Sequence, residues 1–232
     1  MSEKNILCII PARGGSKRIP RKNIVELCGK PMLAYTIEAA EQSKLFDRVI
    51  VSTEDDEIAA VAEKYGAYVE KRNKELATDK ATVLDVCLDL LEKYENEGQS
   101  FDYICILLPT SPLRTGDDLV NAFKKFEESD GNALMAVTTY AISPFWALKE
   151  DNGFLVPYFG EKYMVRSQDL PEVFVDNGAV YVFKIDTLKQ ERRFFCSKLV
   201  PFEMPRERSI DVDEKVDLEL AEFFLSKKEG GK

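Results

Sequence analysis

Short apolar runs alternate with longer amphipathic segments along the first 139 residues, and this alternation limits the folds open to the chain. The pattern predicts strands at 6–10, 48–53, 67–70, 103–108 and 133–139, and helices at 31–43, 55–65, 82–94 and 117–128. Strands that alternate with helices of about 10–15 residues indicate right-handed βαβ units around a parallel sheet. Ligands of such sheets bind beyond the carboxyl ends of the strands. We therefore expect the functional loops after Ile10, Val51 and Leu108.

The alternation stops at residue 140, where a segment rich in aromatic residues begins. This segment contains the only tryptophan, Trp146, and short alternating runs. It predicts a β-hairpin arm over 140–175 that either covers the site or pairs with a second subunit. The arm carries more aromatic surface than one hairpin can bury, which predicts a homodimer. Beyond the arm, strands at 178–184 and 198–203 and helices at 185–190 and 214–227 complete a single domain over 1–232.

The composition excludes several classes of function. With 32 Lys and Arg against 41 Asp and Glu, the chain lacks the extended basic face expected of a nucleic-acid-binding protein. It has no histidine, which excludes Ser–His and Cys–His mechanisms and His-ligated metals, so a metal here would be a hard cation held by oxygen. Five scattered cysteines, no signal peptide and no apolar run of membrane length predict a cytoplasmic protein without a membrane partner.

A loop dense in positive charge follows the first predicted strand. It reads P-A-R-G-G-S-K-R-I-P-R-K-N over residues 11–23, with two adjacent glycines and the cations Arg13, Lys17, Arg18, Arg21 and Lys22. Small residues let backbone N–H groups approach a polyphosphate, and the cations offset its charge. The spacing matches neither the P-loop nor the dinucleotide-binding fingerprint. The basic loop therefore predicts an anion site, with a solvated basic turn as the alternative.

Two aspartates near the end of the chain form a second candidate. Asp211 and Asp213 lie in an extended segment, where alternate side chains point the same way. Two carboxylates on one face are costly unless a cation joins them, and oxygen ligands suit Mg²⁺. The alternative is that Asp213 caps the helix predicted from 214 and that Asp211 is solvated. The basic loop favours Mg²⁺, because a phosphate site and a Mg²⁺ carboxylate pair belong together.

Two further polar segments could face a substrate. Residues 166–171 (R-S-Q-D-L-P) lie on the predicted arm, where Arg166 suits a carboxylate. The alternative there is an exposed ion pair between Arg166 and Asp169, which would stabilise the protein little. Residues 109–114 (P-T-S-P-L-R) follow a predicted buried strand, where a site loop is expected, or else they form the first turn of a helix.

Four blocks of this sequence together resemble the acylneuraminate cytidylyltransferases, also called CMP-sialic acid synthetases. They are the basic loop, L-P-T-S-P-L-R at 108–114, R-S-Q-D-L-P-E-V-F-V-D-N-G-A-V-Y at 166–181 and S-I-D-V-D-E-K-V-D-L-E-L-A-E at 209–222. The resemblance implies an α/β fold: a Rossmann-like nucleotidyltransferase three-layer sandwich with a mostly parallel sheet, dimerising through a β-rich arm. It also implies a reaction in which CTP and a nine-carbon 2-keto-3-deoxy sugar acid (a nonulosonic acid) give the CMP-sugar and pyrophosphate, with Mg²⁺.

The resemblance implies roles for individual residues as well. The catalytic residues are Arg13, Lys22 and Asp211. The nucleotide-binding residues are Ala12, Arg13, Gly14, Gly15, Ser16, Lys22, Asn23 and Arg72, of which Arg72 falls on the cytosine side. The Mg²⁺ ligands are Asp211 and Asp213, and the sugar-side residues are Leu108, Arg166 and Gln168.

Two positions depart from the family. Leu108 stands where many sialic acid enzymes have a glutamine that contacts the sugar, and Val83 stands where a small hydroxyl residue is expected near the nucleotide. The first departure leaves sialic, legionaminic and pseudaminic acids open as substrates. A 3-deoxy-manno-octulosonate cytidylyltransferase and a catalytically silent nucleotide-binding protein of the same fold are the alternatives. Without histidine, the sugar's proton passes to a carboxylate, with Asp211 the nearest candidate, to Mg²⁺-bound hydroxide or to solvent.

Overall fold

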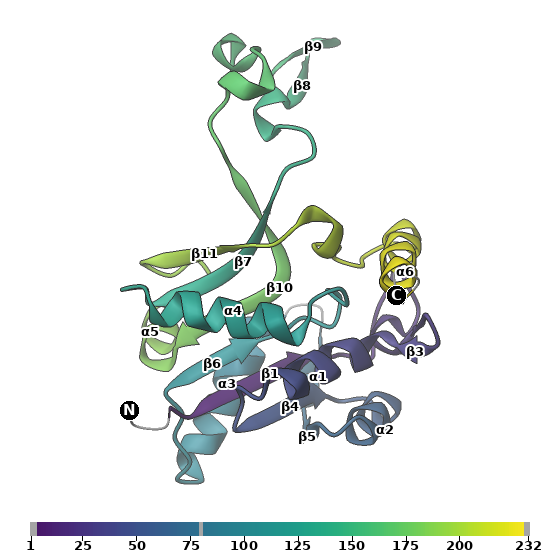
Figure 1. Ribbon diagram of the computed structural model, residues 1–232, viewed down its shortest axis with the longest axis vertical. Helices are drawn as coiled ribbons and strands as arrows, with labels where there is room; N and C mark the ends of the chain where they lie inside the picture. Colours follow the sequence, from purple (N-terminus) through teal and green to yellow (C-terminus); the bar gives the residue numbers. More distant parts are fainter. Residues whose placement is uncertain (1–3, 79–80, 230–232) are drawn as a thin grey trace.

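A seven-stranded sheet forms the centre of the computed structural model, which describes residues 4–78 and 81–229 (Figure 1). Across the sheet, the strands are β11 (Leu199–Glu203), β7 (Ala133–Thr139), β10 (Phe174–Lys184), β6 (Tyr103–Ile106), β1 (Ile6–Pro11), β4 (Arg48–Thr53) and β5 (Tyr68–Lys71). Within this sheet β10 runs antiparallel to both of its neighbours, and the other pairings are parallel. The predicted mostly parallel sheet is confirmed.

Helices cover both faces of the sheet. On one face lie α1 (Met32–Ser43), α2 (Asp56–Lys64) and α4 (Gly116–Glu127), and on the other lie α3 (Val83–Asn96) and α5 (Ile185–Glu191). The side chains of β1 alternate between these two cores, with Cys8 and Ile10 in the first and Leu7 and Ile9 in the second. Because both faces are covered, β1 reads as a continuous apolar run, and the predicted three-layer sandwich is confirmed.

Three of the helices, α2, α3 and α4, begin at polar capping residues that the sequence displays. The Asp55 carboxylate accepts the N–H groups of Glu57 and Ile58 at the start of α2. Thr82 and Thr115 each head a capping box, at the starts of α3 and α4 respectively. For α2 and α3, the predicted start falls on the capping residue itself, one position before the first helical residue.

Strand ends were predicted less accurately than helix starts. The strand predicted to end at 108 stops at Ile106, and the strand predicted to begin at 178 begins at Phe174. Phe174–Asp176 pairs with the end of β7 ahead of a break in register between Asp176 and Tyr181. Aspartate, asparagine and glycine near this bulge have low strand propensity, so the sequence does not indicate a strand there. The strand continues because it pairs with β7.

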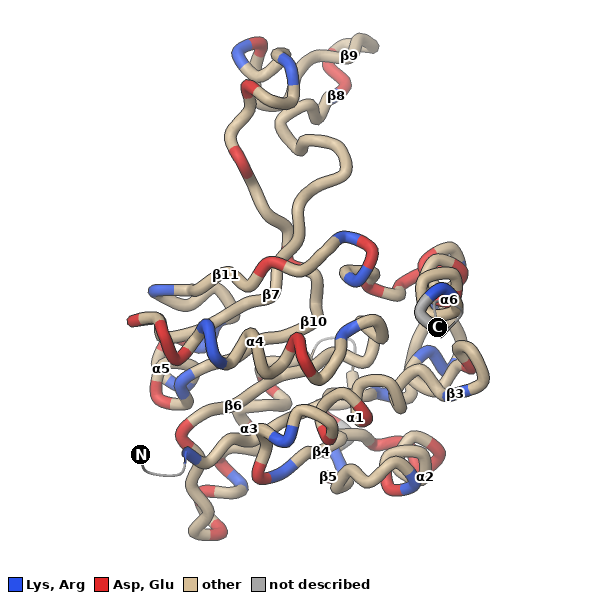
Figure 2. The backbone as a smooth tube through the Cα atoms, in the orientation of Figure 1, with Lys and Arg blue, Asp and Glu red and all other residues tan. Residues whose placement is uncertain are grey.

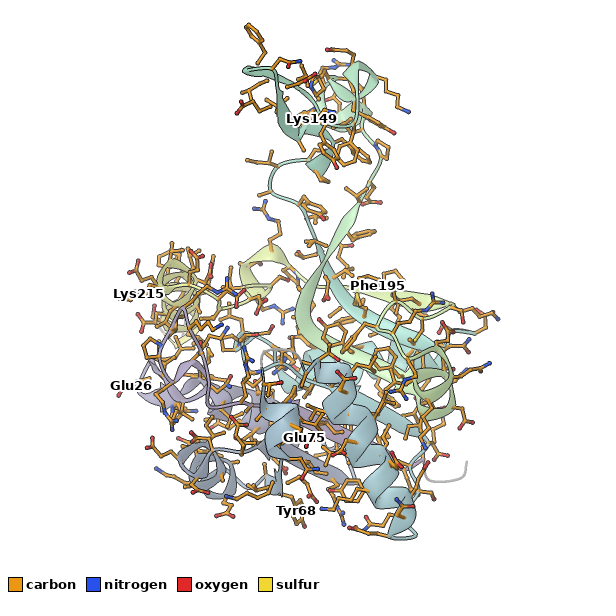
Figure 3. The ribbon with its side chains drawn as sticks, turned by 180° about the vertical axis from the view of Figure 1, so that it is seen from behind. Glu26, Tyr68, Glu75, Lys149, Phe195 and Lys215 are labelled. Atoms are coloured by element: carbon orange, nitrogen blue, oxygen red, sulfur yellow. The ribbon has the colours of Figure 1, made fainter. Side chains whose placement is uncertain are left out.

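The segment predicted as an arm extends away from the sheet and contains a β-hairpin (Figures 1 and 3). It contains β8 (Leu148–Asp151) and β9 (Phe154–Pro157), joined by a two-residue turn at Asn152 and Gly153, both with positive φ. The side chains of Ile142, Phe154 and Leu155 are 72%, 74% and 70% exposed.

A small unit beside the sheet supports the end of the basic loop. The two-stranded β2 (Glu26–Leu27) and β3 (Lys30–Pro31) packs with α6 (Lys215–Glu229) around Leu27, Met32 and Ala221. Acidic residues are spread over the helices and the arm, with basic residues among them (Figure 2). Within residues 4–78 and 81–229, the helices are too short or too polar to cross a membrane.

Candidate active site

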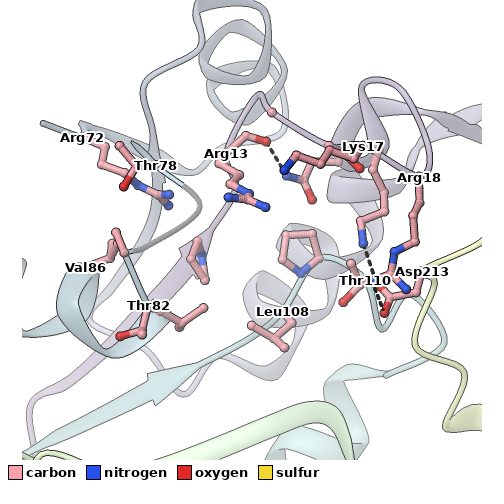
Figure 4. A pocket seen from close by; sticks show the side chains of 18 of the residues that line it. Arg13, Lys17, Arg18, Arg72, Thr78, Thr82, Val86, Leu108, Thr110 and Asp213 are labelled. Carbon is pink, nitrogen blue, oxygen red and sulfur yellow. Dashed lines mark hydrogen bonds and ion pairs between the residues drawn. The ribbon is translucent and has the colours of Figure 1, made fainter. Parts of the chain in front are cut away.

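A cavity of about 600 Å³ opens at the carboxyl ends of β1 and β6 (Figure 4). The basic loop, the start of α3, the loop after β6 and the segment before α6 supply its walls, as the fold rule for parallel sheets predicts. Its lining residues are Pro11, Arg13, Gly15, Ser16, Lys17, Arg18, Lys22, Asn23, Arg72, Thr78, Ala81, Thr82, Val83, Val86, Leu108, Pro109, Thr110, Asp211 and Asp213.

The turn between β4 and α2 anchors the basic loop from behind. The Gly14 N–H donates to Glu54 Oε1 at 2.8 Å, and a Cβ on Gly14 would lie 2.6 Å from Asp55 Oδ2, so a larger residue would displace the turn. Arg21, in the left-handed region at φ 56°, grips Asp55 with both of its terminal nitrogens and donates to Glu57 at 2.7 Å. The Arg21 hydrogen bonds lower the pKa of Asp55 to about 2. Arg21 is therefore a clamp on the loop, and it is not among the described lining residues.

Two residues expected to contact the nucleotide are turned into the protein. Ala12 is fully buried and its N–H donates to the Ser52 carbonyl at 3.0 Å. Gly14 donates its N–H to Glu54. Neither is among the described lining residues, because both N–H groups hold the loop to β4 and its following turn. Gly15 and Ser16 do line the cavity.

The remaining cations of the basic loop face the cavity. Lys22 Nζ lies 2.8 Å from Asp213 Oδ1, and Arg18 Nη2 lies 2.7 Å from Asp213 Oδ2. Asn23 is buried and its Nδ2 donates to the Arg13 carbonyl at 2.8 Å, which fixes the loop where it turns back toward its start. The alternative of a freely solvated basic turn does not fit this degree of attachment.

The two aspartates share the cavity but differ in their electrostatics. Asp211 lines the cavity, but the surrounding protein removes much of its hydration, and this desolvation raises its pKa. The negative charge of Asp213 raises the pKa of Asp211 further, whereas a hydrogen bond from Thr110 opposes the shift. Burial alone would raise the pKa of Asp213, but the hydrogen bond and charge of Lys22, with those of Arg18, outweigh it and lower that pKa. Asp211 is therefore the better proton acceptor of the two, and Asp213 the more firmly ionised.

The aspartate pair fits a hard cation that the substrate helps to bind. Within the part of the chain that the structure describes, no group of three or more Cys, Asp and Glu side chains is arranged to hold a metal. Mg²⁺ is commonly held by one or two carboxylates together with substrate phosphates, so two aspartates in a cavity lined by Arg and Lys side chains suit it. The helix-cap alternative for Asp213 is wrong, because the Asp217 carboxylate accepts the N–H groups of Asp213 and Glu214 at the start of α6.

Arg72 lies at the other end of the cavity, beside Thr78 and Thr82 (Figure 4). It donates from Nη2 to the Ser52 carbonyl at 2.8 Å, and burial lowers its pKa. Val83 lines this end too, so the departure from a hydroxyl residue lies within the cavity. The cavity thus has a wall with a fixed guanidinium and mostly small or apolar neighbours, a setting that a planar base would suit.

The arm residues do not reach this cavity within one chain. Arg166 Nε lies 3.0 Å from Asp169 Oδ2 and its side chain is 76% exposed, which is the ion pair expected as the alternative. Gln168 is also exposed. Neither is among the described residues that line the cavity, because the arm extends away from the sheet (Figure 1).

One buried arginine that the sequence did not single out holds three elements together. Arg114 is 3% exposed and donates to the Ala179 carbonyl at 2.5 Å, to Thr36 Oγ1 at 2.6 Å and to the Leu108 carbonyl at 3.3 Å. Burial lowers its pKa to about 10. Arg114 therefore positions the wall at Leu108 against the bulge of β10. The signal for it was an arginine at the end of the apolar L-P-T-S-P-L-R block.

Comparisons with known proteins agree with this geometry. Residues 7–222 match the family model for cytidylyltransferases. A pseudaminic acid cytidylyltransferase of Campylobacter jejuni is 41% identical, over 94% of this chain and 95% of the relative. A CMP-N,N'-diacetyllegionaminic acid synthase of Legionella pneumophila is 34% identical, over 95% and 96%. An N-acylneuraminate cytidylyltransferase of Streptococcus agalactiae is 35% identical over 91% of this chain and 51% of the relative.

Solved structures share the fold. The CMP:2-keto-3-deoxy-manno-octonic acid synthetase complexed with CTP superimposes with a TM-score of 0.68, over 97% of this chain and 100% of that one. A 4-diphosphocytidyl-2C-methyl-D-erythritol synthase gives 0.71, over 96% and 98%. At 16% and 13% identity these likenesses concern the fold alone, so the first gives the octulosonate alternative no further support. From the family model and the relatives, the chain belongs to the cytidylyltransferases, as a nucleotidyltransferase of the acylneuraminate type.

Proposed function

We propose that the chain transfers CMP from CTP to a nonulosonic acid of the pseudaminic acid type and releases pyrophosphate. The observation that carries the proposal is that Arg13, Lys22, Asp211 and Asp213 line one cavity at the strand ends. The choice of sugar is supported by 41% identity to a pseudaminic acid enzyme, against 34% and 35% for legionaminic and N-acylneuraminate enzymes.

The nucleotide would lie along the basic loop. Arg13 and Lys22 offset the charge of the triphosphate, and the N–H groups of Gly15 and Ser16 lie where the loop faces the cavity. Asn23 holds the loop at Arg13, and Arg72 takes the cytosine at the opposite end. Arg72 and Asp213 lie at opposite ends of the cavity (Figure 4), so the base and the phosphates would contact different walls.

The reaction is an in-line displacement at the α-phosphorus. The anomeric hydroxyl of the sugar acid attacks, the bond to the β-phosphate oxygen breaks, and pyrophosphate leaves. Asp211 is the nearest named carboxylate to accept the proton of the attacking hydroxyl. Asp211 and Asp213 would hold Mg²⁺, which when bound offsets negative charge on the phosphates. Arg13 and Lys22 stabilise the charge that develops on the leaving group.

The sugar side would be completed by a second subunit. Leu108 gives this part of the cavity an apolar surface in place of an amide. Arg166 and Gln168 on the arm of one subunit would supply polar contacts to the cavity of the other, in a cytoplasmic homodimer. The exposed apolar side chains of the arm support such pairing, because a lone chain leaves them in water.

Pyrophosphate release from CTP tests the proposal. The chain is incubated with pseudaminic, legionaminic, sialic and 3-deoxy-manno-octulosonic acids, each with Mg²⁺ and with a chelator instead. We expect the highest kcat/KM with pseudaminic acid and no release without Mg²⁺. A preference for another acid would contradict the sugar assignment, and CTP binding without release for any acid would favour the silent alternative.

A further inference from the structure

Asp213 has a cation on each of its two oxygens. Lys22 Nζ lies 2.8 Å from Oδ1 and Arg18 Nη2 lies 2.7 Å from Oδ2 (Figure 4). Lys22 is a proposed phosphate ligand, whereas Arg18 has no role in the function proposed above. The Arg18 side chain is 57% exposed and lines the cavity, so its guanidinium is at the wall that the triphosphate would meet.

This arrangement conflicts with metal binding before the nucleotide arrives. A divalent cation that approaches Asp213 must displace, or bind beside, two fixed positive charges. Each carboxylate oxygen already accepts a charge-assisted hydrogen bond, which the metal would have to replace. The empty protein therefore presents Asp213 as an anchor for cations of the basic loop, and only secondarily as a metal ligand.

A triphosphate would remove the conflict. Phosphate oxygens compete for the same donors, and the planar fork of an arginine matches two of them at once. Arg18 and Lys22 come from one loop and converge on one carboxylate, so an anion that enters beside Asp213 meets both. Their transfer to phosphate would leave Asp213 with free oxygens at the moment when a metal and additional phosphate ligands are present.

We propose that Arg18 is a further triphosphate-binding residue, held by Asp213 in the empty protein and exchanged onto the nucleotide as Asp213 takes the metal. This inference rests on the proposed function. It makes the binding of nucleotide and of divalent metal mutually favourable. The nucleotide draws the cations away from Asp213, and the metal takes their place on its carboxylate.

Arg21, in the same loop, differs from Arg18 in where its acidic partners lie. Its guanidinium is gripped by Asp55 and Glu57 behind the loop, where it cannot reach the cavity without breaking the clamp. Arg18 has its partner inside the cavity wall. The neighbouring arginines of one basic loop are thus divided between anchoring and ligand binding.

Arg18→Met separates the proposal from a structural role, because two binding constants should move in opposite directions. CTP binding, measured by titration calorimetry, should weaken about 10-fold with the loss of a charge-assisted contact. Binding of Mn²⁺ without nucleotide, measured by electron paramagnetic resonance, should tighten, since Asp213 loses one competing cation. Arg18→Lys keeps the charge and should fall between Arg18→Met and the unchanged protein in CTP affinity. Arg206→Met, an exposed arginine that is not among the described lining residues, controls for net charge.

Two results would overturn the inference. One is a CTP affinity of Arg18→Met within twofold of the Arg206→Met control. The other is weaker CTP binding together with unchanged or weaker Mn²⁺ binding, which would mean a damaged loop without exchange. The unchanged protein distinguishes this failure from failure of the proposed function: if it binds no CTP, the proposed function falls, and if it binds CTP normally, only the role of Arg18 is refuted.

Discussion

The basic loop and the arm both carry residues expected to bind substrate, but one chain completes only the first. The loop is held by hydrogen bonds and ion pairs at Gly14, Arg21 and Asn23, all to residues of its own chain. In the arm, Arg166 pairs with its neighbour Asp169 and remains exposed.

Under the proposed function, this difference separates nucleotide binding by the loop from sugar binding by the arm. A loop that is already anchored in this way would lose little conformational entropy on binding the proposed nucleotide. The arm has its own aromatic cluster, in which Phe145 stacks on Tyr163 at 4.6 Å, yet leaves its outer apolar side chains in water. We therefore expect changes on the loop to alter CTP handling in any oligomeric state, and changes on the arm to act through the dimer.

The largest effect should come from Asp211→Asn. Loss of the proton acceptor and of one metal ligand should lower kcat by about 10²–10⁴-fold. The amide keeps the shape of the side chain, so thermal unfolding should be unchanged. Pyrophosphate release at saturating substrates measures kcat, and turnover near that of the unchanged protein would refute the role of Asp211.

Introducing charge on the arm, in Phe154→Lys with Leu155→Glu, should convert the proposed dimer to a monomer. Light scattering at micromolar concentration measures the mass. CTP affinity should remain within twofold, whereas kcat/KM for the sugar acid should fall about 10-fold with the loss of arm contacts. Tyr68→Ser removes an exposed aromatic side chain at the end of the molecule opposite the arm and is the matched control (Figure 3). If the unchanged protein is itself a monomer, the arm does not form a dimer and the proposed contrast between the loop and the arm is wrong.

Arg114→Met should destabilise the fold and displace Leu108, the cavity-lining residue that Arg114 positions. The carbonyls of Leu108 and Ala179 would lose their buried donor, lowering the free energy of unfolding by about 1–3 kcal/mol. Urea unfolding followed by tryptophan fluorescence and by circular dichroism measures it. An unchanged free energy would mean that relief from a buried charge offsets the lost hydrogen bonds.

Asp55→Asn should have the smallest effect, because asparagine keeps the cap of α2 and removes only the ion pair with Arg21. We expect a loss of about 1 kcal/mol at pH 7, reduced by the partial exposure of Arg21. The folded-state pKa of Asp55 is lowered to about 2, so its contribution is present above the ordinary carboxyl range and is lost as the pH falls toward 2. The stability difference between variant and unchanged protein should therefore shrink between pH 5 and about 2. A difference that does not vary with pH would show that the clamp is not electrostatic.

The fold was largely predictable because its signals are local. The run at Ile6–Ile10 and the caps at Asp55 and Thr82 depend on residues within a few positions of one another. The extension of β10 to Phe174 was not predictable in this way, since it depends on pairing with Thr139, 35 residues earlier.

The sequence predicted which residues belong to the candidate site better than it predicted how they are oriented. Arg13, Lys22, Asp211 and Asp213 were all expected, and all line the cavity. The sequence could not show that Arg21 turns away. Its left-handed backbone and its partners on the β4–α2 turn arise only when the loop packs against β4.

By itself, the sequence determined an α/β sandwich with a loop dense in positive charge after its first strand, because apolar alternation, caps and charge density are properties of neighbouring residues. The tertiary structure decided which cations face the cavity, which carboxylate each one meets, and that Arg114 joins α1, β10 and the loop after β6. Those outcomes depend on distances between segments far apart in the chain. Only the packing of the sheet and its helices sets such distances.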